Sequence, residues 1–294
     1  MTTQMTTVAE GYHFLEAPRW RDGRLWFSDF YGHRVRSMRE DGADVREEAY
    51  VPEQPSGLGW LPDGRLLIVS MRDRRVLRRE EDGTLAVHAD LGEYATGYAN
   101  DLVVDEQGRA YVGNFGFDLM AGHPLEPAAL HRVDPDGHVT QVADDLWFPN
   151  GSAITRENVL LVVETFGNRV TAFDLTADGA LINRRVWVEF GPLPVDRDVE
   201  PALAQLRVAG DGACLDAEGG LWIADATGGR LIRVTEDGVI TDQIEPGTPV
   251  YACALGGIEG NTLFACAAPD FNARARTAAR EARMLAVQVS VPGA

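Results

Sequence analysis

The sequence repeats itself six times at a spacing of roughly 40 to 60 residues, and this repetition restricts the fold more than any other feature. Each copy contains an apolar run, a tight turn and a second apolar run. Strands that open with Arg-Val or Arg-Leu follow in most copies, so each copy predicts two hairpins. The turns read RDGRLW, LPDGRLL, DEQGRAY, TRENVLL, DAEGGLW and IEGNTLF, with Gly23, Gly64, Gly108, Asn158, Gly219 and Gly260 at the turn.

Six units of four short strands predict an all-β fold, a six-bladed β-propeller. The sixth unit lacks an outermost strand after residues 284–291, whereas the chain begins with a spare extended segment, TTVAEGYHF. We therefore expect the two ends to close the ring together. No Ser/Gly linker or low-complexity tract interrupts the sequence, so residues 1–294 are expected to form a single propeller domain.

Four oxygen-bearing side chains occur at the same phase of the repeat, about seven or eight residues before the turn. They are Glu16, Asn100, Asn150 and Asp211, and the remaining two copies have Ser56 and Ala252 at that place. Equal phase means equivalent positions in space, so repeats arranged around an axis would bring these residues together. Two carboxylates and two amides form an oxygen-only ligand set that suits a hard divalent cation. The sequence therefore predicts a metal site.

The dipeptides Asn150-Gly151 and Asp211-Gly212 would, taken alone, predict hairpin turns. The repeat phase contradicts this interpretation, because the turns of those two units lie further along the chain. Strand alternation predicts that Asp101 points away from Asn100 and is structural. Ser56 is expected to be a small pore-lining residue, since no G-x-S-x-G elbow surrounds it.

The motifs EAPRW, PSGLGW, YANDLVVDEQG, FPNGSAIT and GDGACLDAEGGLWIAD resemble those of the senescence marker protein, gluconolactonase and luciferin-regenerating enzyme family. The resemblance runs from about Glu16 to Leu255 and implies a six-bladed propeller with a divalent cation, commonly Ca²⁺, in its central channel. By this resemblance Glu16, Asn150 and Asp211 bind the metal, and Asn100 faces the substrate or a metal-bound water. Mg²⁺, Mn²⁺ and Zn²⁺ are the alternatives to Ca²⁺.

One departure from the family pattern concerns the substrate. Sugar-lactone enzymes of the family often place an Arg two residues before the asparagine of the ND motif, and this chain has Tyr98 there. Neighbouring positions are apolar as well, so an apolar substrate is expected. The expected substrate-binding residues are Asn100, Tyr98, Phe115, Phe117, Trp147 and Phe148.

These residues predict a metal-dependent hydrolase of a small, largely apolar lactone or ester-like substrate. Asp211 is the expected general base or nucleophile, Asn100 positions water or substrate, and Tyr98 donates a hydrogen bond to the leaving oxygen. Two alternatives stay open. The same ligands could serve an epoxide hydrolase or a phosphotriesterase, or the propeller could bind calcium or a ligand without turnover.

Charge and composition exclude several other classes. A net charge of −18 and a pI near 4.7 argue against nucleic acid and anionic membranes as partners and leave a small molecule. All 27 basic residues are Arg, which excludes lysine-based nucleophilic chemistry. No apolar stretch is long enough for a membrane span and no secretory signal is seen, so a cytoplasmic location is expected. The oligomeric state is left open.

Three long connections, at about residues 115–129, 190–210 and 268–283, are expected to form lids on the ligand face. Most of the histidines are expected near strand ends or turns, and no spacing among them suggests zinc. The cysteines Cys214, Cys253 and Cys266 are expected to be buried reduced thiols, with a Cys253–Cys266 bridge as the alternative.

Overall fold

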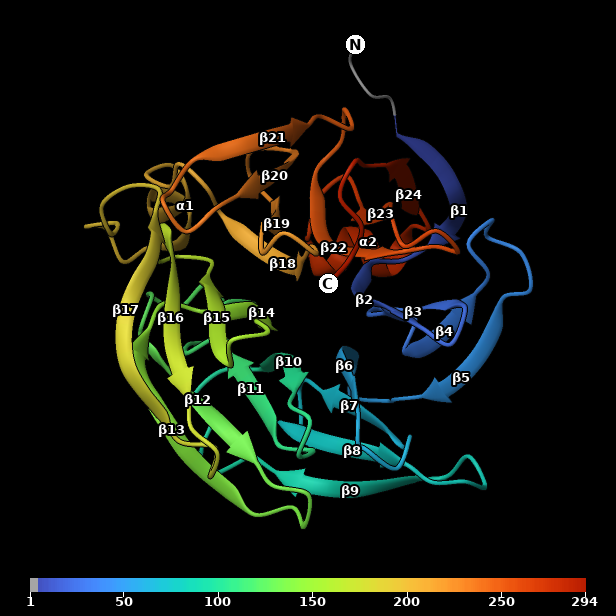
Figure 1. The fold of residues 1–294 in the computed structure, drawn as a ribbon, viewed down its shortest axis with the longest axis horizontal. Coiled ribbons are helices and arrows are strands. Elements are labelled where there is room, and N and C mark those ends of the chain that lie inside the picture. Colours follow the sequence, from blue (N-terminus) through green and yellow to red (C-terminus); the bar gives the residue numbers. More distant parts are fainter. Residues whose placement is uncertain (1–4) are drawn as a thin grey trace. The chain divides into compact units, whose positions relative to one another are not determined.

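A computed structural model describes residues 5–294. Within them the chain forms six antiparallel sheets of four strands each, which confirms the predicted all-β, propeller-class fold of six blades (Figure 1). The two helices of this part of the chain are short and lie in connections, α1 (Val199–Leu203) and α2 (Ala273–Ala278). The blades divide into two compact units. Unit 1 extends to Pro55 and resumes at Asp211, and unit 2 is Ser56–Gly210.

Unit 1 contains the first, fifth and sixth blades. The first blade is β2 (Leu15–Arg21), β3 (Arg24–Asp29), β4 (Arg34–Met38) and β5 (Arg46–Tyr50). The fifth blade is β18 (Gly210–Leu215), β19 (Leu221–Asp225), β20 (Arg230–Val234) and β21 (Ile240–Ile244). The sixth blade combines β22 (Val250–Gly256), β23 (Thr262–Ala267) and β24 (Ala282–Gln288) with β1 (Thr6–Tyr12).

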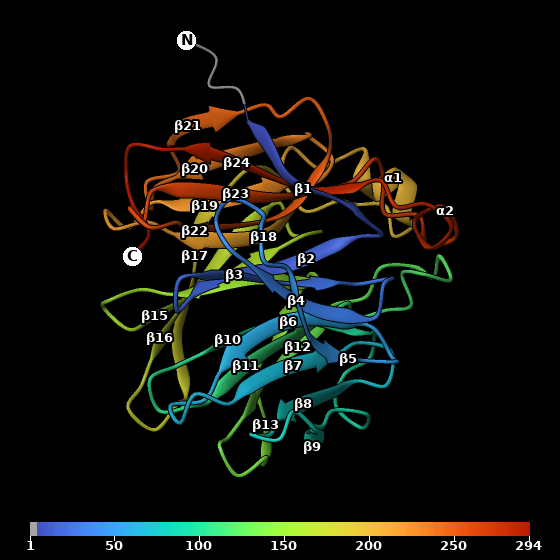
Figure 2. The same ribbon diagram turned by 90° about the vertical axis from the view of Figure 1, so that its right-hand side faces the viewer.

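The N-terminal strand completes the sixth blade, as the sequence predicted. Strand β1 pairs antiparallel with β24, with Thr6 opposite Ala286 and Tyr12 opposite Ala282. The two strands lie side by side in Figures 1 and 2. Without β1 the backbone groups on the outer edge of β24 would be an unpaired sheet edge, which a protein must cover or blunt.

Unit 2 contains the second, third and fourth blades, in chain order. The second blade is β6 (Pro55–Trp60), β7 (Leu66–Ser70), β8 (Arg75–Arg79) and β9 (Leu85–Asp90). The third is β10 (Ala99–Val104), β11 (Ala110–Asn114), β12 (Ala128–Val133) and β13 (Val139–Leu146). The fourth is β14 (Pro149–Ile154), β15 (Val159–Glu164), β16 (Arg169–Leu175) and β17 (Leu181–Glu189).

Every turn predicted from the repeat joins the first strand of a blade to the second. All of these turns contain a residue in the left-handed region, with φ of 74° at Gly23, 88° at Gly64 and 58° at Asn158. The equivalent glycines of the third, fifth and sixth blades have φ between 77° and 83°. Glycine and asparagine adopt this conformation at low cost, which is why the turn residues could be recognised in the sequence.

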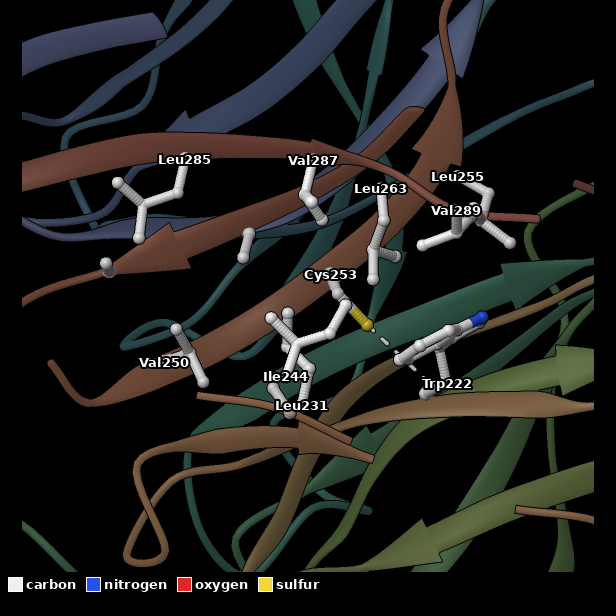
Figure 3. Close-up of a cluster of buried hydrophobic side chains, with 13 residues drawn as sticks. Trp222, Leu231, Ile244, Val250, Cys253, Leu255, Leu263, Leu285, Val287 and Val289 are labelled. Atoms are coloured by element: carbon white, nitrogen blue, oxygen red, sulfur yellow. Dashed lines mark hydrogen bonds between the residues drawn. The ribbon is translucent and has the colours of Figure 1, made fainter. Parts of the chain in front are cut away.

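The core of unit 1 includes a cluster between the fifth and sixth blades (Figure 3). Trp222 and Leu231 of the fifth blade pack there against Cys253, Leu263 and other apolar side chains of the sixth. An equivalent cluster in unit 2 contains Tyr111, Leu130, Leu146, Leu160, Val162 and Phe173 of the third and fourth blades. Side chains that alternate along each strand thus fill the space between adjacent sheets.

The three cysteines are free, as predicted. Cys253 and Cys266 are buried, but Cys214 is only half-buried, which corrects the expectation for that residue. The alternative Cys253–Cys266 bridge does not form. Cys266 lies opposite Ala252 in the β22–β23 pair and Cys253 opposite Ala265, so the two thiols extend from opposite faces of the sheet. The neighbour of Cys253 is Cys214, with 3.9 Å between the sulfur atoms. A hydrogen bond with Cys214 and burial both raise the pKa of Cys253.

Two histidines correct the expectation that these residues lie at strand ends or turns. His88 in β9 and His131 in β12 are both buried, with exposed fractions of 8% and 1%. Burial lowers the pKa of His131 to about 4, because the charged ring would lose its hydration. The ring of Tyr94 packs edge-on against it at 5.8 Å between centroids.

The buried imidazole of His131 should make the protein sensitive to acid. A pKa lowered from 6.5 to about 4 means that the folded state favours the neutral ring, so stability is present above pH 6.5 and lost as pH falls towards 4. This site alone would cost up to about 3 kcal/mol over that range. Chemical denaturation of wild type and His131→Phe at pH 7 and pH 4.5 measures the effect, and the variant should lose less stability. The exposed His138→Phe is the control and should match the wild type.

Candidate functional site

The residues predicted to lie at the same phase of the repeat occupy the same position in their blades. Each is the second residue of the first strand of its blade, as the strand bounds show for Glu16 in β2, Asn100 in β10, Asn150 in β14 and Asp211 in β18. Ser56 has the same place in β6. In the sixth blade Ala252 is the third residue of β22, because one extra residue, Tyr251, precedes it.

A β-bulge recurs at this position, which the sequence did not predict. The pairing of β10 with β11 shifts between Ala99 and Leu102, so that Asn100 and Asp101 together lie opposite one residue. The pairing of β14 with β15 shifts in the same way across Asn150 and Gly151. The pairing register also shifts directly after Glu16 in the first blade and at Tyr251 in the sixth blade. A bulge turns a side chain away from strict alternation, so it can direct these residues to a common side.

The two Gly-containing dipeptides lie inside strands, as the repeat phase predicted. Gly212 follows Asp211 in β18, and a Cβ atom there would lie 2.5 Å from the Cβ of Ala252 in β22. Gly57 follows Ser56 in β6, and a Cβ there would lie 2.7 Å from the backbone nitrogen of Leu102. These glycines permit close approach of first strands from neighbouring blades rather than a turn.

The two carboxylates of the predicted metal set belong to unit 1, and both act on the same neighbours. Burial raises the pKa of Tyr251, and the negative charges of Asp211, Asp270 and Glu16 raise it further. Burial also raises the pKa of Cys266, with additional contributions from Glu16 and Asp211. Glu16 and Asp211 are both half-buried. Unit 1 therefore places two acids, one on β2 and one on β18, within electrostatic reach of the phenol of Tyr251 on β22.

The two amides belong to unit 2, and their hydrogen bonds orient them differently. The Asn150 Nδ2 atom donates to Thr165 Oγ1 at 3.0 Å, which leaves the amide oxygen as the atom available to a cation. The Asn100 Oδ1 atom instead accepts from Ser56 Oγ at 3.2 Å, which directs the amide NH₂ elsewhere. The first orientation suits a metal ligand, and the second suits a donor to substrate or water. Asp101 is buried and its carboxylate accepts the Leu102 N–H, in keeping with its expected structural role.

Most of the rings predicted to bind substrate form one connected cluster in unit 2. Phe115 lies between Tyr98, at 5.8 Å, and Phe148, at 4.5 Å between ring centroids. Phe148 also packs on Phe166, which in turn contacts Phe117. Tyr98 is half-buried and the others are buried. Because Tyr98 and Phe148 each precede an in-phase asparagine by two residues, the cluster lies directly beside the amides.

Trp147 does not join this ring cluster. Its indole instead lies under the guanidinium of Arg197, with 4.2 Å from the Arg Cζ atom to the ring centroid. The backbone oxygen of Arg197 accepts a hydrogen bond from the Leu125 N–H at 2.6 Å. Residues 115–127 and 190–209, two of the three predicted lids, are therefore joined to each other.

The third predicted lid, residues 268–281, contains α2 and belongs to unit 1. The Tyr31 hydroxyl donates to the Phe271 oxygen of this connection, and the ring of Phe14 packs on Tyr251 at 4.7 Å. Arg276 is buried and pairs with Asp270 at 3.2 Å. Its backbone oxygen lies 3.0 Å from His13 Nδ1. These contacts fix the connection beside the residues that lead into Glu16.

Several residues of the site were missed in the sequence. Tyr251 was missed because it lies one residue out of phase, and the bulge that accounts for this has no sequence signal of its own. Phe166 and Arg197 lie on other elements than their partners, so only the fold brings them to the cluster. Thr165 immediately follows β15, and its role depends on the amide orientation of Asn150.

Among residues 5–294, no three His, Cys, Asp or Glu side chains gather in a group that could hold a metal ion. The predicted ligand set takes only two of its members from these residue types, so it would not form such a group. Within the same residues, no helix has the length and apolar character of a membrane span.

Comparison with known proteins identifies the family. Residues 14–268 match the family model described as "SMP-30/Gluconolactonase/LRE-like region". The chain belongs to this family.

The relatives of the chain include binding proteins and enzymes by name. It is 25% identical to regucalcin of Danio rerio, over 85% of this chain and 81% of the relative. It is 28% identical to a pentonolactonase of Haloferax volcanii, over 85% and 79%. Among solved structures, a calcium-binding protein, regucalcin, from Agrobacterium tumefaciens matches with a TM-score of 0.80 and 20% identity, covering 100% of this chain and 96% of that one. This last likeness supports the fold.

Proposed function

We propose that the protein is a metal-dependent hydrolase of a small, largely apolar lactone or ester-like substrate. The observation that carries the proposal is the recurrence of oxygen-bearing side chains at the second residue of five first strands, in a member of a family whose relatives include a named lactonase. Family membership favours a lactone over an epoxide or a phosphotriester. All six blades would then act as one domain.

Glu16, Asn150 and Asp211 would hold the divalent cation, with Ca²⁺ as the first choice. The donor set fits such an ion, because it consists of two carboxylates and an amide whose nitrogen is already bound to Thr165. When bound, the ion supplies a positive charge that stabilises the negative charge of an acyl-transfer transition state.

Side chains of the protein would carry out the remaining catalytic and binding roles. Asp211 would remove a proton from the attacking water as general base, or attack as nucleophile. Asn100 would use the amide NH₂ that Ser56 leaves available to orient the water or the substrate. The phenol of Tyr98 would donate a hydrogen bond to the leaving oxygen. The rings of Phe115, Phe117, Phe148 and Trp147 would enclose the apolar part of the substrate and exclude water.

A second candidate function is binding of calcium without turnover. It is favoured by the description of the Agrobacterium tumefaciens relative as a calcium-binding protein. The two functions differ in a panel of aromatic and aliphatic lactones, esters, epoxides and phosphotriesters assayed with saturating Ca²⁺. A lactonase turns over at least one lactone, whereas a binding protein binds Ca²⁺ and turns over none of the panel.

Removal of charge from the ligand set should weaken metal binding. We expect Asp211→Ala and Glu16→Gln each to reduce Ca²⁺ affinity or turnover at least about tenfold, because each removes one formal negative charge from the cation's ligands. Isothermal titration and kcat/KM on purified folded protein measure the two quantities. Asp22→Asn, at an exposed turn of the same unit, is the matched control. Wild-type behaviour in both variants would contradict the assignment.

The choice of metal should follow ligand hardness. EDTA is expected to abolish turnover, and Ca²⁺ should restore it better than Zn²⁺, because the proposed ligands are oxygen atoms and include no histidine or cysteine. The measurement is the initial rate after dialysis against chelator and addition of each ion. Full turnover in a sample shown to be metal-free by elemental analysis would refute metal dependence.

The aromatic cluster should decide the substrate preference. Apolar burial at about 25 cal/mol per Å² predicts that an alkyl- or aryl-substituted lactone has a kcat/KM at least about tenfold above that of gluconolactone. Tyr98→Arg should lower this ratio of kcat/KM values, because the guanidinium offers hydrogen-bond donors to sugar hydroxyls. Tyr50→Arg, on the exposed outer strand β5, is the control and should leave the ratio unchanged. Preference of the wild type for gluconolactone would show that the rings do not set specificity.

A further inference from the structure

Three blades share a sequence motif at the end of the second strand. An acidic residue is followed three residues later by Gly and five residues later by Arg, as in Asp29-Phe-Tyr-Gly32-His-Arg34. The other two copies are Glu164-Thr-Phe-Gly167-Asn-Arg169 and Asp225-Ala-Thr-Gly228-Gly-Arg230. The three carboxylates have exposed fractions of 3%, 0% and 0%, so each is buried at the end of its sheet.

In the fourth and fifth blades an ion pair joins the two ends of the motif, whereas Arg34 of the first blade pairs with Glu47 at 2.9 Å. The acidic residue and the Arg lie opposite each other in the second and third strands of the blade, as Glu164 and Arg169 do. The Arg169 Nε atom donates to Glu164 Oε1 at 2.8 Å, and the pair in the fifth blade has the same distance. The glycine is required for space, since a Cβ at Gly167 would lie 2.9 Å from Glu164 Oε2.

In two of the blades the carboxylate also binds the chain that leads into the first strand. Glu164 Oε2 accepts the Trp147 N–H at 2.8 Å, three residues before Asn150. Asp29 Oδ1 accepts the N–H groups of His13 at 3.1 Å and Phe14 at 3.3 Å, three and two residues before Glu16. A buried carboxylate is a strong acceptor for backbone N–H groups, so it fixes where each first strand begins.

In the fourth blade, residues that follow the second strand hold Trp147 and Phe148, which lead into Asn150. The Thr165 N–H donates to the Phe148 oxygen at 3.0 Å, and the Phe166 N–H donates to the Trp147 oxygen at 3.1 Å. Phe148 has φ of 57°, a left-handed conformation that a bulky side chain rarely adopts. The Thr165 hydroxyl then accepts the Asn150 amide. Residues 164–166 thus hold a strained segment and orient the side chain that follows it.

The motif occurs in the same three blades as the proposed metal ligands. It occurs in the first, fourth and fifth blades, whose first strands carry Glu16, Asn150 and Asp211. The second strands of the other three blades end with Ser70, Asn114 and Ala267.

Loop length alone does not account for this distribution. The second blade joins its second and third strands through residues 71–74, a connection as long as those of the three motif blades. Yet Ser70 stands opposite Arg75 there, and Arg75 pairs with Asp73 and Asp90 instead.

The geometry points to Glu164 and Asp29 as positioning residues for the metal ligands Asn150 and Glu16, and the shared motif extends the role to Asp225 and Asp211. This inference rests on the proposed metal-dependent function. The carboxylate of the fourth blade is balanced by Arg169, so its effect on the cation is transmitted through the backbone that it holds. The residues themselves do not touch the substrate.

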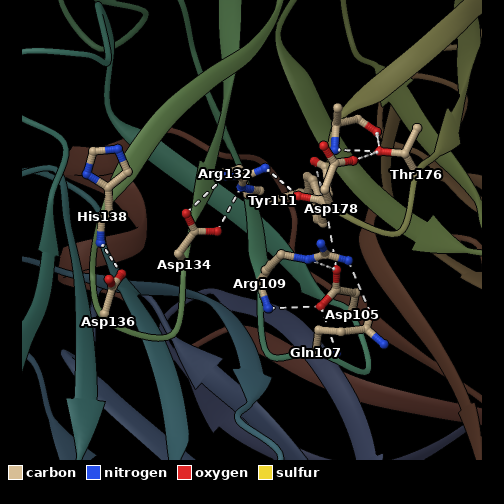
Figure 4. Close-up of polar contacts among 12 residues, drawn as sticks. Asp105, Gln107, Arg109, Tyr111, Arg132, Asp134, Asp136, His138, Thr176 and Asp178 are labelled. Carbon is tan, nitrogen blue, oxygen red and sulfur yellow. Dashed lines mark hydrogen bonds and ion pairs between the residues drawn. The ribbon is translucent and has the colours of Figure 1, made fainter.

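The test compares Glu164→Gln with Asp105→Asn. Asp105 is a matched control in the same unit, because it is buried, pairs with Arg109 at 2.6 Å and accepts backbone N–H groups of Gln107 and Arg109 (Figure 4). It lies in the turn between β10 and β11, at the end of its blade remote from the start of the first strand. Both variants should lower Tm, but only Glu164→Gln should weaken Ca²⁺ binding, by at least about tenfold in isothermal titration well below Tm.

A kinetic readout separates positioning from general destabilisation. At saturating Ca²⁺ the kcat of Glu164→Gln should return to near the wild-type value, because the defect lies in metal affinity. Should Glu164→Gln not fold, Asp29→Asn replaces it, with Asp216→Asn as the control in unit 1, since Asp216 is buried and pairs with Arg233 at 2.6 Å.

The outcomes are distinct. Wild-type Ca²⁺ affinity in Glu164→Gln and Asp29→Asn, or equal weakening in their controls, would overturn the inference while the metal-dependent function stands. A wild-type protein that binds no Ca²⁺ and hydrolyses no lactone would overturn the proposed function and this inference with it.

Discussion

The close approach of neighbouring first strands is the constraint on which the rest of the structure depends. In unit 1 it brings β18 against β22 at Gly212, and in unit 2 it brings β6 against β10 at Gly57. No side chain larger than hydrogen fits at these contacts. The polar residue immediately before each glycine is therefore held at a fixed place. Oxygen atoms buried in this way must find partners, because an unsatisfied polar group costs a few kcal/mol.

Buried charge is a second constraint on the structure. Glu164 and Asp225 are completely buried, and each is compensated by an arginine of the adjacent strand. A buried ion pair adds little net stability compared with apolar packing, but removal of one partner leaves an uncompensated charge and is strongly destabilising. Such a pair is therefore better suited to fixing a geometry than to stabilising the fold. Glu164 fixes the segment before β14 by accepting the Trp147 N–H, and Asp29 fixes the segment before β2 by accepting the N–H groups of His13 and Phe14.

Much of the fold could be predicted from the sequence because its signals are local and repeated. The turn glycines, the hairpins and the pairing of the N-terminal strand with the sixth blade follow from a motif that occurs six times. The in-phase positions of Glu16, Asn100, Asn150 and Asp211 were likewise found from the spacing to a turn. Apart from the β1–β24 pairing, which joins residues 280 apart and was inferred from the strand missing in the last repeat, each of these features depends on residues within about ten positions of one another.

The features that escaped prediction depend on contacts between distant segments. His131 was expected near a strand end or turn, but it is buried within β12, where it packs beside Tyr94 from the connection that precedes the third blade. The Cys214–Cys253 contact joins residues 39 apart, and no local pattern in the sequence indicates it. The acidic-Gly-Arg motif was visible in the sequence. Its meaning was not, because only the folded chain shows which backbone groups the carboxylate accepts.

The arrangement of polar and aromatic groups bears on how substrates of this family are distinguished. The amides of unit 2 lie beside rings at the positions two residues before Asn100 and Asn150, and Phe115 contacts both rings. An arginine in place of Tyr98 would bring a charged donor into this aromatic cluster, whereas the tyrosine presents a ring and one hydroxyl. Polar recognition of a sugar needs several fixed donors, and an apolar ring needs only enclosed area. One position in the third blade could therefore change the substrate class without changing the ligand residues that we propose for the cation.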